Sequence, residues 1–295
     1  MPGTCGVFGR SRELGAVTAF LAAVPSGPSG LVLEGEAGIG KTTVWTAGVA
    51  DAAARSYQVL SSRPAESEAM LSFAGLGDLL DGVLDPVLAG LPPPQQHALQ
   101  VALLLKDPAG TPLEHRAVCA AFLGVIRHLA ADGPVMIAVD DLQWLDGPSA
   151  AALDYALRRL GREPVGLFAS VRVRADGDAT SWVKSGLGAD HVGYLRIGPL
   201  AAADFEAAIW AADGQRLSRL TVRRLFDASG GNLLYGFELA RALGRMDGGH
   251  LPGDPLPVPA GRTRRGHGPP RTQPTPALIA ADTATLRPPR RRAVT

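Results

Sequence analysis

At 295 residues the chain is long enough to bury a large core in one or two domains. Its 46% hydrophobic content and formal net charge of +1 are ordinary for a globular protein, and two cysteines, Cys5 and Cys119, cannot build a disulfide framework. The first residues lack the pattern of a secretory signal, and no apolar run approaches the roughly 20 residues that span a bilayer. These features exclude a secreted disulfide scaffold and predict a cytoplasmic protein without a membrane partner.

Residues 1–61 predict a helix, a strand, a second helix and a second strand. Apolar residues at helical spacing cover Ser11–Val24, and Leu31–Glu34 is a short apolar run typical of a buried strand. A helix over Lys41–Arg55 and a strand over Tyr57–Ser61 follow.

The segment between the first strand and the second helix carries the pattern G-x-x-x-x-G-K-[ST], the P-loop. Its residues are Gly35, Glu36, Ala37, Gly38, Ile39, Gly40, Lys41 and Thr42, with Thr43 next to it. Glycines in the turn let consecutive backbone N–H groups converge on phosphate oxygens, and the following helix presents its positive end to them. We expect all nine residues to contact nucleotide, Lys41 to reach the β- and γ-phosphates, and the Thr42 hydroxyl to bind Mg²⁺.

Further along the chain, strands and helices continue to alternate. Residues 63–112 are irregular, with one helix suggested by five apolar residues between Leu76 and Leu84, a break at the three prolines 92–94, and a helix over Gln96–Leu105. The remaining predicted elements are a helix at 114–131, a strand at 134–139, a helix at 149–160, a strand at 165–171, an edge strand at 191–197, and helices at 202–212, 216–228 and 233–243. This order predicts an α/β fold with a doubly wound parallel sheet flanked by helices. We therefore expect a P-loop core over residues 1–199, a helical lid subdomain over 200–247 and a Pro/Arg-rich disordered tail over 248–295.

The apolar run Val135–Val139 ends in a pair of acids, Asp140 and Asp141. Ligands of parallel sheets bind beyond the carboxyl ends of the strands, so these acids and the P-loop are expected to converge. We expect Asp140 to hold Mg²⁺ and Asp141 to orient or deprotonate the water that attacks the γ-phosphate. The pair of motifs indicates nucleotide hydrolysis much more strongly than either motif alone.

Several motifs in the same order resemble the AAA-type ATPase module of STAND signalling NTPases, and in particular the large ATP-binding LuxR-type transcriptional regulators of actinobacteria. The resemblance covers roughly residues 7–259. The motifs that carry it are Val7–Arg10 with Glu13 and Leu14, the P-loop, Phe73–Leu76 with Leu79 and Leu80, Asp140–Asp146, the strand closing on Arg172, and Gly230–Leu234 with Glu238–Arg241.

The resemblance implies further roles. Phe8, Gly9 and Arg10 would lie close to adenine and ribose, and Arg172 would read the γ-phosphate, with Arg174 an equally suitable candidate by spacing. The family usually has Gly-Asn-Pro-Leu in the lid, whereas Leu233 stands here in place of the proline, which puts the geometry of the lid in doubt. The preference for ATP over GTP also rests on the resemblance.

The tail departs from the family. From Ala260 onward it holds eight arginines and one acid, Asp282, for a net charge of about +7, so the preceding residues are net acidic. We interpret Gly261–Thr295 as a shifted reading frame or an equivalent truncation of a longer regulator, which the two other reading frames of the gene would reveal. The alternative is a genuine basic extension that attracts nucleic acid non-specifically.

Three functions stay open. The chain is expected to be an ATP-binding switch that hydrolyses ATP slowly, with no helix-turn-helix output region and therefore without direct DNA binding, and with protein partners or self-association possible. A free-standing P-loop enzyme such as a small-molecule kinase is the second reading, although no acceptor-binding motif is visible. The third is a non-functional fragment.

Overall fold

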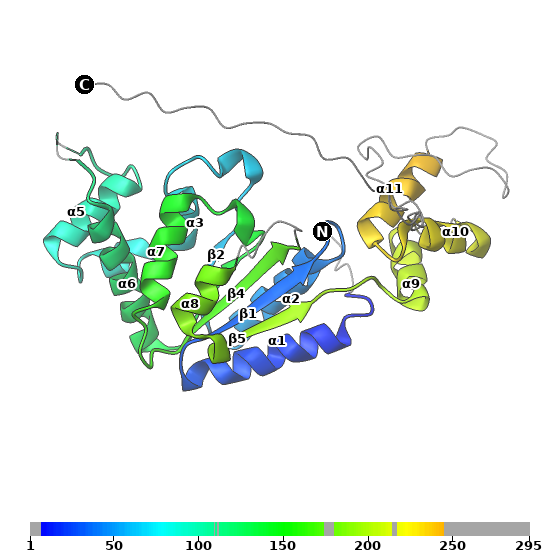
Figure 1. Ribbon diagram of the computed structural model, residues 1–295, viewed down its shortest axis with the longest axis horizontal. Helices are drawn as coiled ribbons and strands as arrows, with labels where there is room; N and C mark the ends of the chain where they lie inside the picture. The colour runs from blue at the N-terminus through cyan, green and yellow to red at the C-terminus, as the bar shows by residue number, and fades with distance from the viewer. Residues whose placement is uncertain (1–6, 109, 111, 174–179, 214–216, 245–295) are drawn as a thin grey trace, which may run out of the picture. The chain divides into compact units, whose positions relative to one another are not determined.

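A five-stranded parallel sheet forms the centre of the protein (Figure 1). The computed structural model describes residues 7–108, 110, 112–173, 180–213 and 217–244. The strands are β1 (Ser29–Gly35), β2 (Gln58–Ser62), β3 (Val135–Val139), β4 (Val165–Arg172) and β5 (Val192–Arg196). They lie in the order β2-β3-β4-β1-β5, and every neighbouring pair is parallel. The predicted doubly wound sheet is confirmed, with β5 at one edge as expected.

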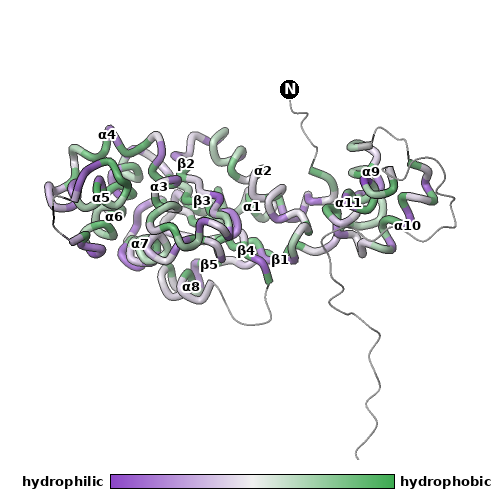
Figure 2. Tube along the Cα trace, turned by 90° about the horizontal axis from the view of Figure 1, so that it is seen from above, coloured by the Kyte–Doolittle hydropathy of each residue, from purple (hydrophilic) through white to green (hydrophobic). Residues whose placement is uncertain are grey.

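Helices cover both faces of the sheet. They are α1 (Ser11–Ala23), α2 (Lys41–Ala54), α3 (Ala74–Leu80), α4 (Leu84–Leu88), α5 (Pro93–Ala102), α6 (His115–Asp132), α7 (Gly147–Leu157) and α8 (Ser181–Leu187). Hydrophobic and hydrophilic residues alternate along these helices (Figure 2), as expected of helices with one face on a core.

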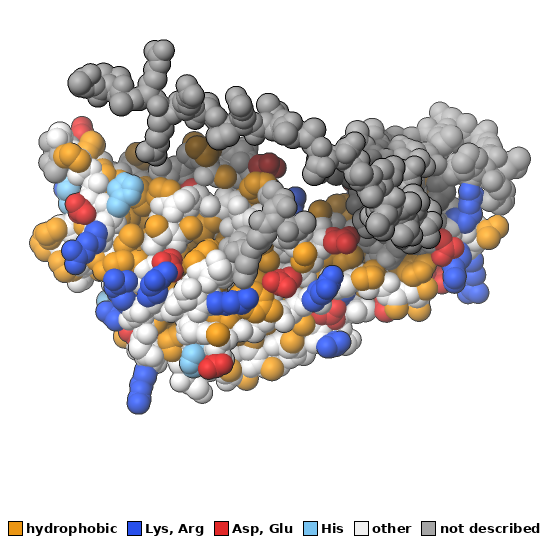
Figure 3. All heavy atoms as spheres, viewed as in Figure 1, with side chains coloured by type: hydrophobic (Ala, Val, Ile, Leu, Met, Phe, Trp, Pro, Cys, Tyr) orange, Lys and Arg blue, Asp and Glu red, His pale blue; other side chains and the backbone are white. Residues whose placement is uncertain are grey.

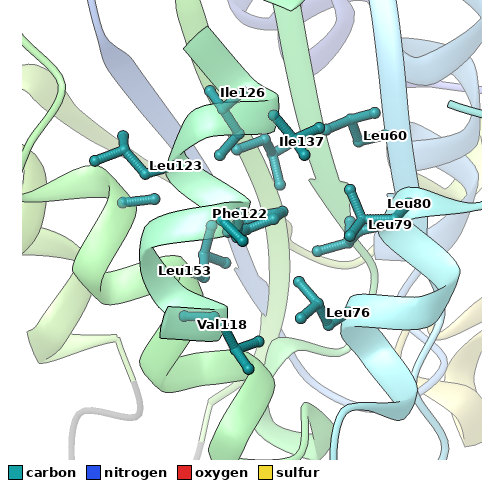
Figure 4. Packing of buried hydrophobic residues seen from close by; sticks show 14 of the residues in the cluster. Leu60, Leu76, Leu79, Leu80, Val118, Phe122, Leu123, Ile126, Ile137 and Leu153 are labelled. Carbon is teal, nitrogen blue, oxygen red and sulfur yellow. The ribbon is translucent and has the colours of Figure 1, made fainter. Parts of the chain in front are cut away.

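Alternate residues of β2, β3 and β4 point to two separate cores. Val135, Ile137 and Val139 of β3 face α3 to α8, whereas Met136 and Ala138 face α1 and α2. In the larger core, Phe122 and Ile126 of α6 pack between the sheet and α3, where Figure 4 labels Leu76, Leu79 and Leu80. All residues of β3 are buried, which explains why this strand reads as one unbroken apolar run.

Three helices follow β5 and enclose a third, smaller core. They are α9 (Ala202–Asp213), α10 (Arg219–Ser229) and α11 (Leu233–Gly244). Phe205, Ile209, Leu225 and Leu239 are among the residues buried between them. The three helices were expected from their apolar periodicity, and no strand interrupts them in the part of the chain that the structure describes.

Several elements differ from expectation, among them α8, which was not predicted, and the helices between residues 76 and 105. The single helix predicted over residues 76–84 is two helices, because α3 ends at Leu80 and the chain turns through Gly82, whose φ of 72° is left-handed. The predicted break is present, because α4 ends at Leu88, but the next helix begins earlier than expected: Pro93 is the first residue of α5, where its missing N–H costs nothing.

By its internal contacts the chain divides after Pro257. Residues 258–295, and with them the whole of the tail predicted over 248–295, lie outside the described residues. Among the residues that are described, no helix has the length and apolarity needed to cross a bilayer.

Candidate functional site

The carboxyl ends of three strands, β1, β3 and β4, meet at one edge of the sheet. The P-loop follows β1, Asp140 follows β3, and Arg172 ends β4. Because β4 lies between β3 and β1, its last residues can bridge the two motifs. The predicted convergence of the P-loop with the acidic pair therefore has a structural basis in the strand order.

Two glycines give the P-loop its shape. Gly38 and Gly40 have φ values of 74° and 108°, a left-handed region that other residues rarely adopt. A Cβ atom at Gly38 would also lie 2.8 Å from Cβ of Leu234 in α11, closer than real contacts allow. Gly40 is the N-terminal cap of α2, so the free amides of the first turn of this helix point toward the loop.

Lys41 is 6% exposed and its ammonium group lies against the backbone of the loop. Nζ donates hydrogen bonds to the carbonyl oxygens of Gly35, at 3.1 Å, and Glu36, at 2.9 Å. Burial lowers the pKa of Lys41 below its ordinary value of 10.5, and the positive charge of Arg172 lowers it too, whereas Asp141 and Asp140 raise it. An anion bound at the loop would supply the negative charge that this buried ammonium lacks.

Arg10, which is 5% exposed, contacts the backbone of the P-loop and supports it. Its guanidinium donates to the carbonyl oxygen of Ile39 at 2.7 Å and to Glu13 Oε1 at 2.9 Å. The chain turns sharply just before it at Gly9, where a Cβ atom would collide with Asp204 of α9 at 2.6 Å. The residues before α1 therefore connect the P-loop to the helices after β5.

A serine of β4, Ser170, holds the carboxylate of Asp140 in place. The hydroxyl of Ser170, which is fully buried, donates to Asp140 Oδ1 at 2.5 Å and accepts the backbone N–H of Asp141 at 2.9 Å. Asp140 is itself 6% exposed, and its second carboxylate oxygen lies 3.8 Å from Nη2 of Arg63. Ser170 thus sets the positions of both acids.

Asp141 adopts a left-handed backbone conformation, with φ of 54° and ψ of 53°. Such a conformation is uncommon for a residue with a side chain and is found preferentially at functional sites. The Asp141 carboxylate accepts a hydrogen bond from Gln143 at 2.9 Å and pairs with Arg172 at 3.4 Å. The Arg172 guanidinium also lies over the ring of Trp144, 5.9 Å from its centroid.

A cavity of about 370 Å³ opens beside these groups. Its walls are Gly38, Gly40, Lys41, Thr42 and Thr43 with Ala37 from the P-loop and α2, Asp141, Arg172, and Leu233, Leu234 and Phe237 from α11. This size lies within the usual range of small-molecule sites. The cavity joins the P-loop, one acid, the arginine and helix α11 in a single space.

Helix α11 is attached to the P-loop through Asn232, which is 6% exposed. Its Nδ2 donates to the carbonyl oxygen of Ala37 at 2.9 Å, and its Oδ1 accepts the N–H of Tyr235 at 3.2 Å, capping the start of the helix. The N–H of Leu234 adds a longer bond of 3.4 Å to the Gly38 carbonyl. Leu233, at the position where the resemblance leads us to expect a proline, lines the cavity.

The predicted site residues therefore fall into two groups. Lys41, Thr42, Thr43, Asp141 and Arg172 surround one cavity, with Asp140 buried beside it. Arg10 points to the back of the P-loop and Phe8 and Gly9 do not line the cavity, so their contact with adenine stays a prediction. Arg174 lies outside the described residues.

Sequence reasoning missed Ser170 and the bond made by Asn232. A signal for Ser170 was present, since it is the one polar residue in the otherwise apolar run Val165–Val171, and a buried hydroxyl in such a strand requires a partner. No local signal revealed the partner of Asn232, because Ala37 lies 195 residues away in the sequence.

We expect Ser170→Ala to lower the free energy of unfolding by about 1–3 kcal/mol, because a buried carboxylate oxygen and a backbone N–H lose their partner together. Chemical denaturation measures this loss, and Ser185→Ala, which removes an exposed serine hydroxyl on α8, is the matched control. Equal stability of the two variants would show that Ser170 does not hold the acidic pair.

Comparisons with known proteins agree with this geometry. A family model described as an AAA ATPase domain matches residues 6–168, more than half of the chain. No curated protein matches the sequence at a significant level.

Solved structures are similar to this chain at low sequence identity. The ORC2 protein of Aeropyrum pernix, in ADPNP and ADP complexes, matches with a TM-score of 0.51 and 14% identity over 80% of this chain and 62% of that one. The ORC1 protein of the same organism, in complex with DNA, gives 0.49 and 19% over 83% and 62%. A signal transduction ATPase with numerous domains and a tetratricopeptide repeat sensor, from Pyrococcus horikoshii, gives 0.38 and 16% over 74% and 28%. The chain thus spans about three fifths of the length of the two ORC proteins.

Proposed function

The chain belongs to the family of AAA ATPase domains, and we propose that it is an ATP-binding, slowly hydrolysing signalling module of a LuxR-type transcriptional regulator. The observation that carries the nucleotide part of this proposal is the one cavity that the P-loop, Asp141, Arg172 and α11 line together, whereas the assignment to a LuxR-type regulator rests on the resemblance of the motifs. A site that only bound phosphate would need the loop alone. The acid and the arginine supply what hydrolysis and its detection require.

The residues around the cavity fit ATP and Mg²⁺. Lys41 is a buried ammonium whose recorded hydrogen bonds go to backbone carbonyls, and the first turn of α2 offers free amides, so the loop is prepared for phosphate oxygens. The Thr42 hydroxyl and Asp140 would hold Mg²⁺, which would supply positive charge to neutralise the phosphates. The buried setting of Asp140 favours a fixed orientation of its carboxylate.

Asp141 is suited to accept a proton from the attacking water, because its carboxylate faces the same cavity as Lys41. In the described structure that carboxylate pairs with Arg172 at 3.4 Å, a loose distance for an ion pair. A bound γ-phosphate would compete for this arginine, since it carries more charge than the carboxylate. Arg172 would thereby report whether ATP or ADP is present.

Helix α11, the proposed lid, can transmit such a signal away from the nucleotide site. Because Asn232 and Leu234 bond directly to the P-loop backbone, a change in the loop acts on the start of α11. The domain division at residues 199 and 247 belongs to this proposal, with the helical part as lid. Signalling then proceeds by a shift of the lid between nucleotide states.

The proposed partners are ATP and other protein domains, without direct DNA binding by this chain. On the face shown in Figure 3, acidic and basic side chains of the described residues are interspersed, and no broad basic surface is visible there. A cytoplasmic location accords with a regulator of transcription.

Two measurements on the full chain test the function. Mg²⁺ and ATP are expected to raise the melting temperature, and phosphate release is expected without any acceptor, at a low rate. Turnover that strictly requires a small-molecule acceptor would identify a kinase instead. Failure of every nucleotide to stabilise the protein would contradict the proposal and favour a non-functional fragment.

The attachment of the lid can be tested at Asn232. Asn232→Asp keeps the oxygen that caps α11 but loses the N–H donor to Ala37, whereas Asn232→Ala loses both. We expect both variants to increase hydrogen exchange in the P-loop and α11, with a loss of about 1 kcal/mol for each missing bond. Full protection of the P-loop in Asn232→Asp would show that this bond does not hold the lid.

A further inference from the structure

A second and larger cavity, of about 630 Å³, lies away from the P-loop. It is formed by the segment before α3, by α3 and the turn after it, and by the end of α5 with the residues that follow. The lining residues are 71–74, 77, 78, 80–82, 84, 85 and 102–105. None of them belongs to the candidate nucleotide site.

The floor of this cavity is apolar and part of the core. Phe73, Leu80 and Ala102 are at most 7% exposed, and α3 directs its other apolar face, including Leu76 and Leu79, into the packing shown in Figure 4. Figure 1 shows α3 and α5 on the same side of the sheet. The floor is therefore fixed by the packing of the domain.

The mouth of the cavity is apolar as well, which is unusual for a surface. Leu104 is 91% exposed, Leu105 62% and Leu71 57%, and all three line the cavity. Exposed leucines that gather around one hollow mark a binding site more often than a bare surface. The molecule that covers them must offer a hydrophobic body.

The charged side chains that line the cavity are all acidic. Three aspartates, Asp78, Asp81 and Asp85, line it, and no lysine or arginine does. Asp78 accepts a hydrogen bond from the hydroxyl of Ser62, at 2.9 Å, so one of its carboxylate oxygens is directed toward the end of β2, where Asp78 and Asp81 also line a smaller hollow that contains Arg63. None of the three forms an ion pair with a basic side chain within the described ranges. The cavity therefore favours a positive charge next to the hydrophobic body.

We propose that this cavity binds a small amphipathic cation, an alkyl or aryl ammonium whose apolar part fills the space beneath the leucines and whose nitrogen faces the three aspartates. The volume lies within the 300–1,000 Å³ typical of small-molecule sites. An anionic amphiphile such as a fatty acid would place its carboxylate among three others. The proposal is independent of nucleotide binding, because no residue is shared by the two sites.

The test compares three probes of one chain length, octylammonium, octanol and octanoate, at concentrations below micelle formation. We expect calorimetric titration of the full chain to show saturable one-to-one binding that is tightest for octylammonium and weakest for octanoate. Asp81→Asn combined with Asp85→Asn is expected to weaken octylammonium by about twofold to fivefold per charge, with octanol unchanged. Leu71→Ser combined with Leu105→Ser should weaken all three probes.

Asp132→Asn, at an exposed acid outside the cavity, is the control for loss of charge alone. All replaced side chains are exposed, so the variants are expected to fold. Octanoate binding as tightly as octylammonium, or octylammonium binding that the variants leave unchanged, would overturn the proposal. Binding of a basic amphipathic peptide but of none of the octyl probes would also overturn it, in favour of a docking site for protein.

Discussion

Lys41→Ala is expected to abolish the stabilisation of the protein by Mg²⁺ and ATP. A ligand at about 100 times its dissociation constant stabilises a native protein by about 2.7 kcal/mol. For a domain of this size that corresponds to a melting-temperature rise of roughly 5–10 °C. The variant should show almost none of this rise in melting temperature. Among the described residues that line the cavity, only Lys41 carries an ammonium group.

The same substitution should leave the protein without nucleotide close to its normal stability. Burial lowers the pKa of Lys41, so its charge opposes folding at neutral pH, and its removal offsets the loss of two hydrogen bonds. Lys106→Ala, at an exposed lysine, is the control. A normal ATP-induced shift in Lys41→Ala would refute the assignment of the P-loop.

The direction of the Lys41 pKa also predicts a pH dependence. The native protein is expected to lose this proton at a pH below 10.5, before the unfolded chain does. Above the lowered pKa the neutral amine binds phosphate weakly, while the folded state without nucleotide gains stability relative to the unfolded chain. The ATP-induced shift, measured by thermal denaturation at increasing pH, should therefore decline before pH 10.5 is reached.

Asp141→Asn is expected to separate hydrolysis from binding. The amide cannot accept a proton from water, and the loss of a general base typically slows a reaction by about 10²–10⁴-fold. Phosphate release should fall by this factor, whereas the ATP-induced rise in melting temperature should persist or increase, because Arg172 is freed from its carboxylate partner. Single-turnover phosphate release and thermal denaturation measure the two effects on the same samples.

Asp154→Asn is the matched control, since Asp154 lies on α7 in an exposed ion pair with Arg158. It should change neither quantity. If Asp141→Asn hydrolyses ATP at the normal rate, the base is another group and the role of Asp141 is wrong. If it fails to bind ATP, Asp141 contributes to binding rather than to the reaction.

Much of this site is visible in the sequence because its parts are local. A P-loop binds phosphate through the backbone of consecutive residues, so the sequence Gly35–Thr42 is enough to predict its geometry. In the same way, an apolar run followed by Asp140 and Asp141 predicts a buried strand with acids at its end. The alternation of strands and helices predicted the parallel sheet for the same reason, since periodicity is a property of neighbouring residues. Element boundaries were less accurate where proline and glycine act by position, as at Pro93 and Gly82.

The tertiary structure alone decided which side chains meet. Ser170 could be recognised as a buried polar residue, but only the placement of β4 between β1 and β3 makes it the partner of both acids. Arg10 is near the P-loop in the sequence. Its side chain reaches the carbonyl oxygen of Ile39, however, because α1 packs against β1 in the same core. Asn232 reaches Ala37 across 195 residues, and the second cavity joins α3 to the end of α5. Motifs made by consecutive backbone atoms are thus determined by the sequence, whereas contacts between distant side chains depend on strand order and helix packing, which a single sequence does not display.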